Sequence, residues 1–281
     1  MFHNGEMVSM QIRYPSGPDQ VRQFTTAELR EHFLVEDLFQ PDQVSAVYTH
    51  HDRVVVAGAL PVAGKPLPLP TFDPLRSEFF LQRREIGVIN VGAAAPVEVD
   101  GTVYVLDHAE CLYIGRGARD VVFHHPGCYY LISSTAHETH PTRHAGPADA
   151  DITRLGSSEG SNDRTIHRYI HAGGIQSCQL VMGVTVLEPG SMWNTMPCHT
   201  HDRRTEIYLY FDLDADHRIV HLMGRPDETR NLIVANEQAV ISPSWSVHCG
   251  FGTRRYAFVW AMAGENQAFD DMDHVAIADM R

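Results

Sequence analysis

The sequence of 281 residues has few cysteines, and their arrangement excludes two common kinds of site. The five cysteines are odd in number and include no CxxC pair, so we expect neither a disulfide framework nor a cysteine-rich zinc site. A glycine-rich phosphate loop and the nucleophile elbow of serine hydrolases are also missing. The sequence therefore points away from disulfide-stabilised folds, nucleotide binding and serine catalysis.

Long apolar runs and a leader-like N-terminus are missing as well. No apolar stretch approaches the roughly 20 residues that span a bilayer. The first eight residues lack the basic and apolar regions of a signal peptide. We therefore predict a soluble, cytoplasmic protein with no membrane partner.

Basic residues are scarce relative to acidic ones. The chain has 22 Lys and Arg against 35 Asp and Glu, which gives a formal net charge of −13. Nucleic-acid binding needs a basic surface, so we expect no nucleic-acid partner. A small anionic substrate stays compatible with this charge because a few local arginines suffice to bind it.

Short β-rich segments broken by Gly, Pro and Asp dominate the chain. One expected helix begins at the capping-box spacing of Thr25 and Glu28. A polar stretch at about 141–163 separates two strand-rich halves. This texture predicts an all-β protein, an antiparallel barrel or jelly roll in each half (1–160 and 161–281), with a few short helices. The expected strands include 44–48, 54–59, 79–81, 86–91, 102–106, 120–123, 165–170, 179–187, 219–223, 231–234, 239–242 and 256–262.

The most informative pattern lies in the second half: His199-Thr-His201, then Glu206 and the distant His248. Two histidines at i and i+2 project from the same face of a strand. Four residues then precede Glu206, which we expect on the facing strand of a tight hairpin, and His248 closes a four-ligand site. Three imidazoles and one carboxylate suit Zn, Fe, Ni or Mn better than Mg or Ca. The pattern predicts a divalent metal site.

Chance placement is the alternative, because the chain contains 18 histidines. Glu206 favours the metal site, since a carboxylate among apolar strand residues is costly to bury unpaired. His248 is the weakest of the four by spacing, and a turn histidine is its alternative role.

Glu206, Tyr208 and Tyr210 share one face of their strand, so both tyrosines are candidates for proton transfer beside the metal. Trp193 and Thr195 have the parity of the first ligand histidine and are candidate substrate-binding residues.

Four arginines near this region are candidates for binding a substrate carboxylate. Arg164 is our first choice, ahead of Arg168, while Arg203 and Arg204 are expected on the solvated rim of the ligand hairpin. Surface charge or a structural ion pair is the alternative for each.

Other residues near or resembling ligands receive ordinary assignments. Cys198 and Cys249 are expected to be buried small apolar residues, because neighbours of a strand ligand point to the opposite face. Loop or surface positions are expected for a second group of histidines: His124, His125, His137, His140 and His144.

The ligand pattern resembles the cupin superfamily, and longer motifs resemble one of its subgroups, the 4-deoxy-L-threo-5-hexosulose-uronate ketol-isomerase family. In the second motif Trp245 stands where general cupins have glycine. The motifs that carry the resemblance are Glu31-His-Phe-Leu-Val-Glu, Arg83-Arg-Glu-Ile-Gly-Val-Ile-Asn-Val-Gly, Met196-Pro-Cys-His-Thr-His, Ser242-Pro-Ser-Trp-Ser-Val-His and Gly264-Glu-Asn-Gln-Ala-Phe-Asp-Asp-Met-Asp-His-Val.

The resemblance implies a double β-barrel (bicupin) enzyme of pectin and uronate breakdown, a homo-oligomer such as a hexamer. It implies one Zn²⁺ per subunit on His199, His201, Glu206 and His248, and a first barrel without metal ligands. The implied reaction converts 5-dehydro-4-deoxy-D-glucuronate to 3-deoxy-D-glycero-2,5-hexodiulosonate. An Fe(II)-dependent cupin dioxygenase and a non-catalytic sugar-acid-binding cupin are the alternatives. The catalytic base stays open, with Glu206, Tyr208 and Tyr210 as candidates.

Overall fold

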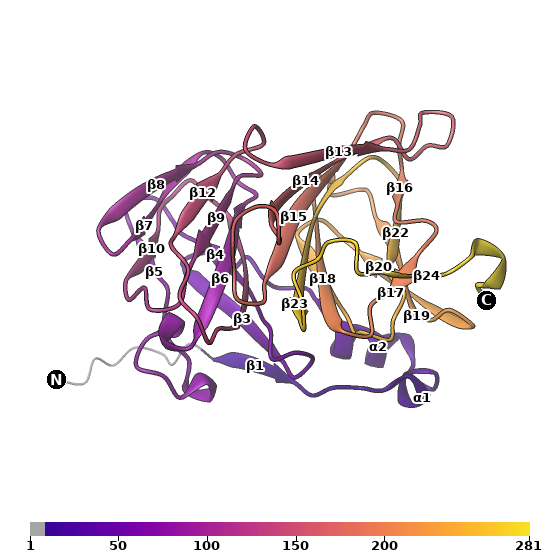
Figure 1. Cartoon of the computed structure of the whole chain (residues 1–281), viewed down its shortest axis with the longest axis horizontal. Coiled ribbons are helices and arrows are strands. Elements are labelled where there is room, and N and C mark those ends of the chain that lie inside the picture. Colours follow the sequence, from indigo (N-terminus) through magenta and orange to yellow (C-terminus); the bar gives the residue numbers. More distant parts are fainter. Residues whose placement is uncertain (1–8) are drawn as a thin grey trace.

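The structure is a computed structural model and describes residues 9–281. Two β-barrels lie side by side along the long axis of the molecule (Figure 1). The strands of the first barrel are β1 (Met10–Arg13), β3 (Gln43–Thr49), β4 (Val55–Leu60), β5 (Leu67–Pro68), β6 (Arg84–Asn90), β7 (Ala95–Val99), β8 (Thr102–Leu106), β9 (Cys111–Ile114), β10 (Val121–Phe123), β11 (Tyr129–Thr135) and β12 (Arg143–Ala145). They form a seven-stranded sheet, β1-β3-β4-β11-β6-β9-β12, and a four-stranded sheet, β5-β10-β7-β8.

The second barrel repeats this arrangement. Its strands are β2 (Leu34–Val35), β13 (Asp151–Leu155), β14 (Arg164–Ile170), β15 (Val181–Leu187), β16 (Trp193–Asn194), β17 (His199–Thr200), β18 (Arg204–Phe211), β19 (Ile219–Arg225), β20 (Glu228–Val234), β21 (Gln238–Ser242), β22 (Cys249–Gly252), β23 (Ala257–Gly264) and β24 (Asp273–His274). The sheets are β13-β14-β15-β23-β18-β21-β2, β16-β22-β19-β20 and β17-β24. Among the described residues, paired strands run antiparallel except β1 and β3. The expected all-β double barrel is confirmed.

Helices are short: α1 (Pro18–Val21), α2 (Thr26–Phe33) and the 3₁₀ turns η1 (Asp73–Leu75), η2 (Phe80–Gln82) and η3 (Ile277–Asp279). The predicted capping box is confirmed, because Glu28 donates its N–H to the Thr25 hydroxyl and accepts the Thr25 N–H with its carboxylate. The expected strand at 79–81 is wrong, since η2 occupies most of it. Such a short apolar run carries no decisive period. No helix in the described part of the chain is long and apolar enough to cross a membrane.

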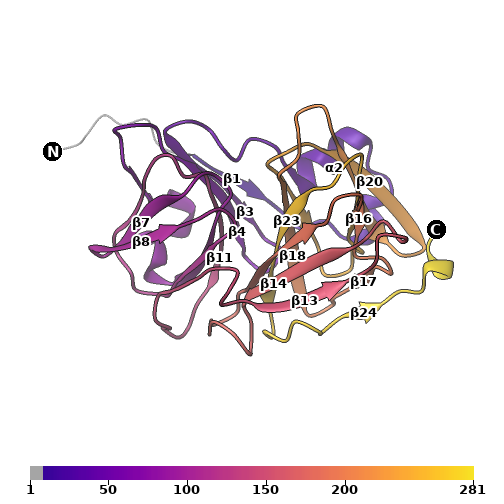
Figure 2. The same ribbon diagram turned by 90° about the horizontal axis from the view of Figure 1, so that it is seen from above.

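Helix α2 packs on the second barrel, although it lies in sequence between β1 and β3 of the first barrel. Helix α2 contacts β20 and β21, as Figure 2 shows for β20, and β2 adds a strand to the edge of β21. Leu29 and Phe33 bury the apolar face of α2 in the core of the second barrel. The segment 26–35 therefore completes the second barrel, while division of the remaining chain near residue 160 stays a prediction.

The two seven-stranded sheets pack against each other through one shared apolar core. Alternate residues of each strand point into their own barrel and into this shared layer, as the period of two requires. Ile86 and Val88 of β6 lie inside the first barrel, whereas Ile89 of β6 and Ile207 of β18 lie in the shared layer. Every residue of β6 and β18 is consequently buried.

A buried carboxylate in this layer links the barrels. Glu85 of β6 is fully buried, and its oxygens accept five hydrogen bonds of 2.7 to 3.0 Å. The donors are the Tyr113 and Ser134 hydroxyls and the backbone N–H groups of Cys178, Gln179 and Leu180. A buried carboxylate is tolerated when its lone pairs are filled in this way.

Candidate metal centre

The four predicted ligands converge in the second barrel. His199 lies in β17, His201 follows it, Glu206 lies in β18, and His248 immediately precedes β22. All four are buried, and one potential ligand atom from each lies within 4.8 Å of the others. The predicted constellation is therefore assembled in space.

The donor atoms face a common point. Glu206 Oε2 lies 2.7 Å from Nε2 of both His201 and His248. The two histidine Nε2 atoms are 3.3 Å apart, and that of His248 is 3.0 Å from Nε2 of His199. Donors bonded to one ion at about 2.1 Å lie roughly 3 to 3.4 Å apart. The spacing and the N₃O donor set fit a borderline divalent metal.

The backbone orients two of the rings. Nδ1 of His201 lies 3.1 Å from the Asp271 carbonyl, and Nδ1 of His248 lies 3.4 Å from the Ser246 carbonyl. A carbonyl at Nδ1 selects the tautomer that carries its proton there and leaves Nε2 free as a ligand. This is the usual support for metal-binding histidines.

The protonation states of His199 and Glu206 also favour metal binding. Burial lowers the pKa of His199 to about 2, and neighbouring His248 acts in the same direction, so the imidazole is neutral. Burial alone raises the pKa of Glu206, but the contacts with His248 and His201 outweigh it and hold the pKa well below its ordinary value. A neutral imidazole and an ionised carboxylate are the metal-binding forms.

The expected ligand hairpin is wrong. β17 pairs with β24 near the end of the chain, with His199 opposite His274, whereas β18 lies between β21 and β23. The residues between the ligands turn from one sheet to another. Glu206 still contacts the histidines, because the turn after His201 leads directly into β18 and brings Glu206 Oε2 to 2.7 Å from Nε2 of His201.

The solvated position expected for Arg204 is also wrong. Its side chain is fully buried and donates to the carbonyls of Ala268, Phe269 and Asp271. Arg203 forms ion pairs of 2.7 and 2.8 Å with the carboxylates of Asp271 and Asp273. The two arginines fasten segment 265–273 over the barrel mouth, because that segment offers carbonyls and carboxylates that water would otherwise satisfy.

A cavity of about 460 Å³ opens beside the ligands. Arg164, Thr195, Tyr208 and His274 are among its polar lining residues, and Trp260 is one of its apolar ones. Arg164 is partly buried, which lowers its pKa, and it donates to the Asn162 carbonyl at 2.8 Å. The cavity volume lies in the range of small-molecule sites, and Arg164 contributes one cationic group to its lining.

The candidate tyrosines differ in access. Tyr208 lines the cavity, and its hydroxyl lies 3.3 Å from that of Thr195. Burial raises its pKa well above the ordinary value, so the phenol stays protonated. Tyr210 lies deeper on the same face, as its parity predicts, and is not among the cavity-lining residues; its hydroxyl lies 2.8 Å from Nδ1 of His221.

Trp193 is not among the residues that line this cavity, and its indole N–H donates to the Gly160 carbonyl. Trp193 was expected on the same face as His199 because the two positions have the same parity along a strand. This expectation is wrong because Thr195 adopts a positive φ of 56° and interrupts the strand after β16. His221 and His274 were not predicted. Only the pairing of β17 with β24 brings His274 to the site, and local sequence contains no signal of that pairing.

The other assigned residues lie largely as expected. Cys198 and Cys249 are fully buried in a small apolar cluster. His137 lies in a loop with Nδ1 3.2 Å from the Cys178 sulfur, and His144 lies 2.8 Å from the Glu110 carboxylate. Arg168 forms an ion pair with a surface aspartate, and does not line the metal cavity.

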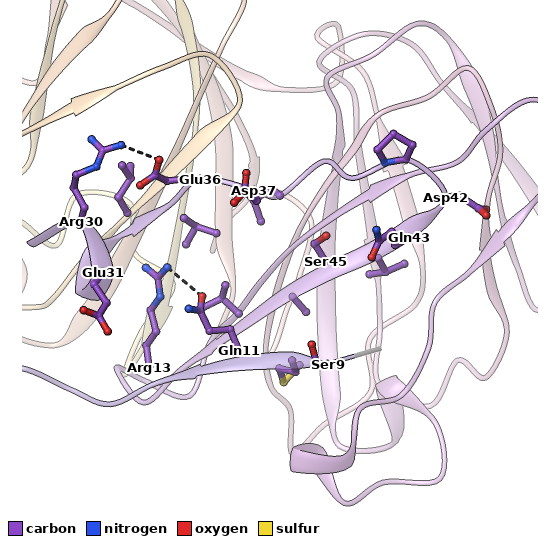
Figure 3. Close-up of a pocket in the computed structure, with 18 residues that line it drawn as sticks. Ser9, Gln11, Arg13, Arg30, Glu31, Glu36, Asp37, Asp42, Gln43 and Ser45 are labelled. Carbon is purple, nitrogen blue, oxygen red and sulfur yellow. Dashed lines mark hydrogen bonds and ion pairs between the residues drawn. The ribbon is translucent and has the colours of Figure 1, made fainter. Parts of the chain in front are cut away.

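A larger cavity, of about 910 Å³, lies between β1, α2 and β3 (Figure 3). Its polar side chains include the pair Arg30–Glu36 and the carboxylates of Glu31 and Asp37. None of the described residues that line it is a histidine, cysteine or tyrosine. The larger cavity volume therefore does not identify the reactive site. The four converging ligands identify the smaller cavity as that site.

Residues 38–277 match the KduI/IolB family model. The chain belongs to the KduI/IolB family. It is 53% identical to the 4-deoxy-L-threo-5-hexosulose-uronate ketol-isomerase of Halalkalibacterium halodurans, over 97% of this chain and 100% of that protein. It is 54% identical to the protein of the same name from Kineococcus radiotolerans, again over 97% and 100%. The family resemblance predicted from the motifs is confirmed.

Two solved structures of distant sequence share the fold. An IolB-like protein from Salmonella typhimurium superposes with a TM-score of 0.67 at 15% identity, covering 86% of this chain and 96% of that one. A mutant of Bacillus subtilis oxalate decarboxylase gives a TM-score of 0.52 at 9% identity, covering 76% and 70%. At such identities the likeness concerns the double-barrel fold alone.

Proposed function

We propose that this protein is a metal-dependent ketol-isomerase that converts 5-dehydro-4-deoxy-D-glucuronate to 3-deoxy-D-glycero-2,5-hexodiulosonate in uronate catabolism. The observation that carries the proposal is identity above 50% with ketol-isomerases over nearly the whole chain. The buried cluster of three histidines and one glutamate beside a cavity supports it.

We propose one Zn²⁺ per subunit, held by His199, His201, Glu206 and His248. Three imidazoles and one carboxylate with donor atoms 2.7 to 3.3 Å apart, the neutral ring of His199 among them, support this assignment. A divalent ion held there supplies Lewis-acid polarisation of a carbonyl and its neighbouring hydroxyl. His274 and Tyr208 line the same cavity, and their rings contact those of the ligands His199 and His248.

The carboxylate end and the carbonyl end of the substrate bind to different parts of the cavity. Arg164 binds the carboxylate, because it is the arginine among the described cavity-lining residues and its backbone hydrogen bond fixes its position. The carbonyl end then lies toward the ligand cluster. Thr195 and the protonated hydroxyl of Tyr208 donate hydrogen bonds to substrate oxygens.

The reaction moves one proton between adjacent carbons with no net oxidation. The C–H bond beside the aldehyde breaks, a C–H bond forms at the former aldehyde carbon, and the hydroxyl proton passes from the second oxygen to the first. Glu206 is held by two histidines and acts as a ligand in this scheme. Of the two candidate tyrosines Tyr208 is the one that lines the cavity, and we assign it the hydroxyl-proton transfer.

Proton NMR of the purified protein with the unsaturated-uronate breakdown product tests the proposal, with metal content measured in parallel. We expect interconversion without oxygen, and its loss in His201→Ala but not in His50→Ala, an exposed histidine of the first barrel. Oxygen-dependent turnover with bound iron would instead identify a dioxygenase. Saturable binding without interconversion would identify a sugar-acid-binding protein.

We also propose a homo-oligomer acting in the cytoplasm. Five unpaired cysteines suit a reducing compartment. Val103 and Val105 on the edge strand β8, and Ile152 and Leu155 on β13, are exposed apolar residues suited to contacts between copies. Light scattering after size-exclusion chromatography measures the number of subunits, for which the family resemblance implies six.

A further inference from the structure

The first barrel contains a cavity of about 500 Å³ that shares no lining residue with the metal cavity. Three arginines, Arg83, Arg84 and Arg116, line it together with Thr135 and His137. None of the described residues that line it is an aspartate or glutamate. In a chain with a net charge of −13, this cavity concentrates positive charge.

The most buried of these arginines is fixed by neutral acceptors. Arg84 is 5% exposed and donates to the hydroxyl and carbonyl of Ser133, at 3.0 and 2.8 Å, and to the Arg53 carbonyl at 2.6 Å. Its Nη1 donates to none of the described residues. The neighbouring carboxylate of Glu85 is already bound by five donors in the layer between the barrels. It therefore does not form an ion pair with Arg84.

The other two arginines are held in the same manner. Arg83 donates to the Leu75 carbonyl at 2.7 Å, and Arg116 donates to the Gln82 and His137 carbonyls at 3.2 and 3.0 Å. No ion pair joins any of the three to a carboxylate of the described residues. Carbonyl contacts fix the direction of a guanidinium but leave its charge uncompensated.

One wall of the cavity comes from the second half of the chain. Gln179 lines the cavity, and its side-chain amide donates to the Thr135 hydroxyl at 3.3 Å. The backbone of Gln179 is held by Glu85. A ligand in this cavity therefore contacts both halves.

We propose that this cavity is a second ligand site, which binds a small oxyanion, the carboxylate or phosphate group of a metabolite, through Arg83, Arg84 and Arg116. Guanidinium groups match both kinds of oxyanion through paired hydrogen bonds. The volume lies in the range of small-molecule sites. The site is independent of the proposed catalytic reaction, and occupancy stabilises the folded protein by mass action.

Calorimetry and thermal unfolding test the site, with inorganic phosphate and D-galacturonate as separate probes at constant ionic strength. The experiment uses the His201→Ala/Arg164→Gln protein as well as the wild type, so that neither a bound metal ion nor Arg164 of the metal cavity contributes to the binding that is measured. We expect saturable binding of at least one probe and a higher unfolding temperature with it. Phosphate binding identifies a phosphoryl ligand, and galacturonate binding identifies a carboxylate.

The double variant Arg83→Gln/Arg116→Gln is expected to weaken binding at least tenfold. Arg225→Gln, an exposed arginine of the second barrel, is the matched control and leaves the affinity unchanged. If the double variant does not fold, Ser77→Glu places a carboxylate at the cavity without removing an arginine and has the same expected effect. Absence of saturable binding to the wild type, or equal affinity in these variants, overturns the proposal.

Discussion

One carboxylate oxygen of Glu85 in the first barrel accepts a hydrogen bond of 2.7 Å from the backbone N–H of Gln179 in the second half. The adjacent N–H groups of Cys178 and Leu180 bind the same carboxylate. Three consecutive N–H groups are thus satisfied by one side chain from the other barrel. The three residues that lead into β15 are therefore held by the first barrel.

Glu85→Gln replaces one of these acceptor oxygens with an NH₂ group that faces donors. We expect the free energy of unfolding to fall by about 2 to 4 kcal/mol, because buried donors lose their acceptor. Urea denaturation measures the change. Glu159→Gln, at an exposed loop position, is the control and should stay within about 0.5 kcal/mol of wild type.

Arg204→Lys removes the planar group that binds three carbonyls of the C-terminal segment. We expect faster hydrogen exchange across 265–276 and a loss of about 2 to 3 kcal/mol in stability, since one ammonium cannot satisfy the same carbonyls. Arg203→Lys retains a charge near the half-buried Asp271 and the exposed Asp273, and should change stability by less than about 1 kcal/mol. Equal exchange in both variants would show that Arg204 does not fasten this segment.

Metal removal is expected to lower the unfolding temperature of wild-type protein, because an ion that binds only the folded chain stabilises it by mass action. Addition of Zn²⁺ after chelation should restore both the unfolding temperature and turnover. His199→Ala should respond to neither treatment. A wild-type melting curve that is identical with and without chelator would contradict a metal at the four ligands.

His108 of the first barrel donates toward Asp212 of the second, with Nε2 3.1 Å from the carboxylate. This hydrogen bond raises the pKa of His108 above its ordinary value of 6.5. A raised pKa means that the stabilisation is complete below pH 6.5 and is lost as the pH rises through the folded value. Both side chains are substantially exposed, so the effect is below about 1 kcal/mol.

The pH dependence is measured by comparing wild type with His108→Ala. We expect the difference in unfolding free energy to shrink as the pH rises above 6.5. A difference that grows with pH would mean that His108 stabilises the protein as a neutral ring.

Gly58→Ala tests close packing in the first barrel. A Cβ at Gly58 would lie 2.4 Å from the Leu38 carbonyl oxygen, which is backbone and moves little. We expect a loss of about 1 to 3 kcal/mol in unfolding free energy. Gly17→Ala is the control, because a Cβ added at Gly17 would have no atom within 4 Å among the described residues.

The sequence alone predicted the ligand cluster because its signals are largely local. The parity of His199 and His201 and the apolar surroundings of Glu206 need only the period of a strand. The family motif around Trp245 then supplied the distant His248. The double barrel followed in the same way from regular strand spacing without alternating helices.

The remaining features of the site depend on contacts between distant segments. His274 reaches the cavity through pairing with β17, and the burial of Arg204 depends on carbonyls more than 60 residues away in the chain. Neither position differs in local composition from a surface loop. The inward or outward direction of Trp193 likewise depends on one residue, Thr195, whose φ is positive.

Strand β2 pairs with a strand that is synthesised about 200 residues later, which affects how the chain folds during translation. Leu34 pairs with Val240, so all strands of the first barrel except β1, and most of the second barrel, leave the ribosome between the two partners. Domains tend to fold in the order of synthesis, yet α2 and β2 emerge before nearly all of both barrels and can join their sheet only after β21 has been made. The apolar residues of α2 and β2 therefore stay exposed or loosely packed while the first barrel folds. A newly made chain is therefore most exposed to chaperones and proteases at its beginning.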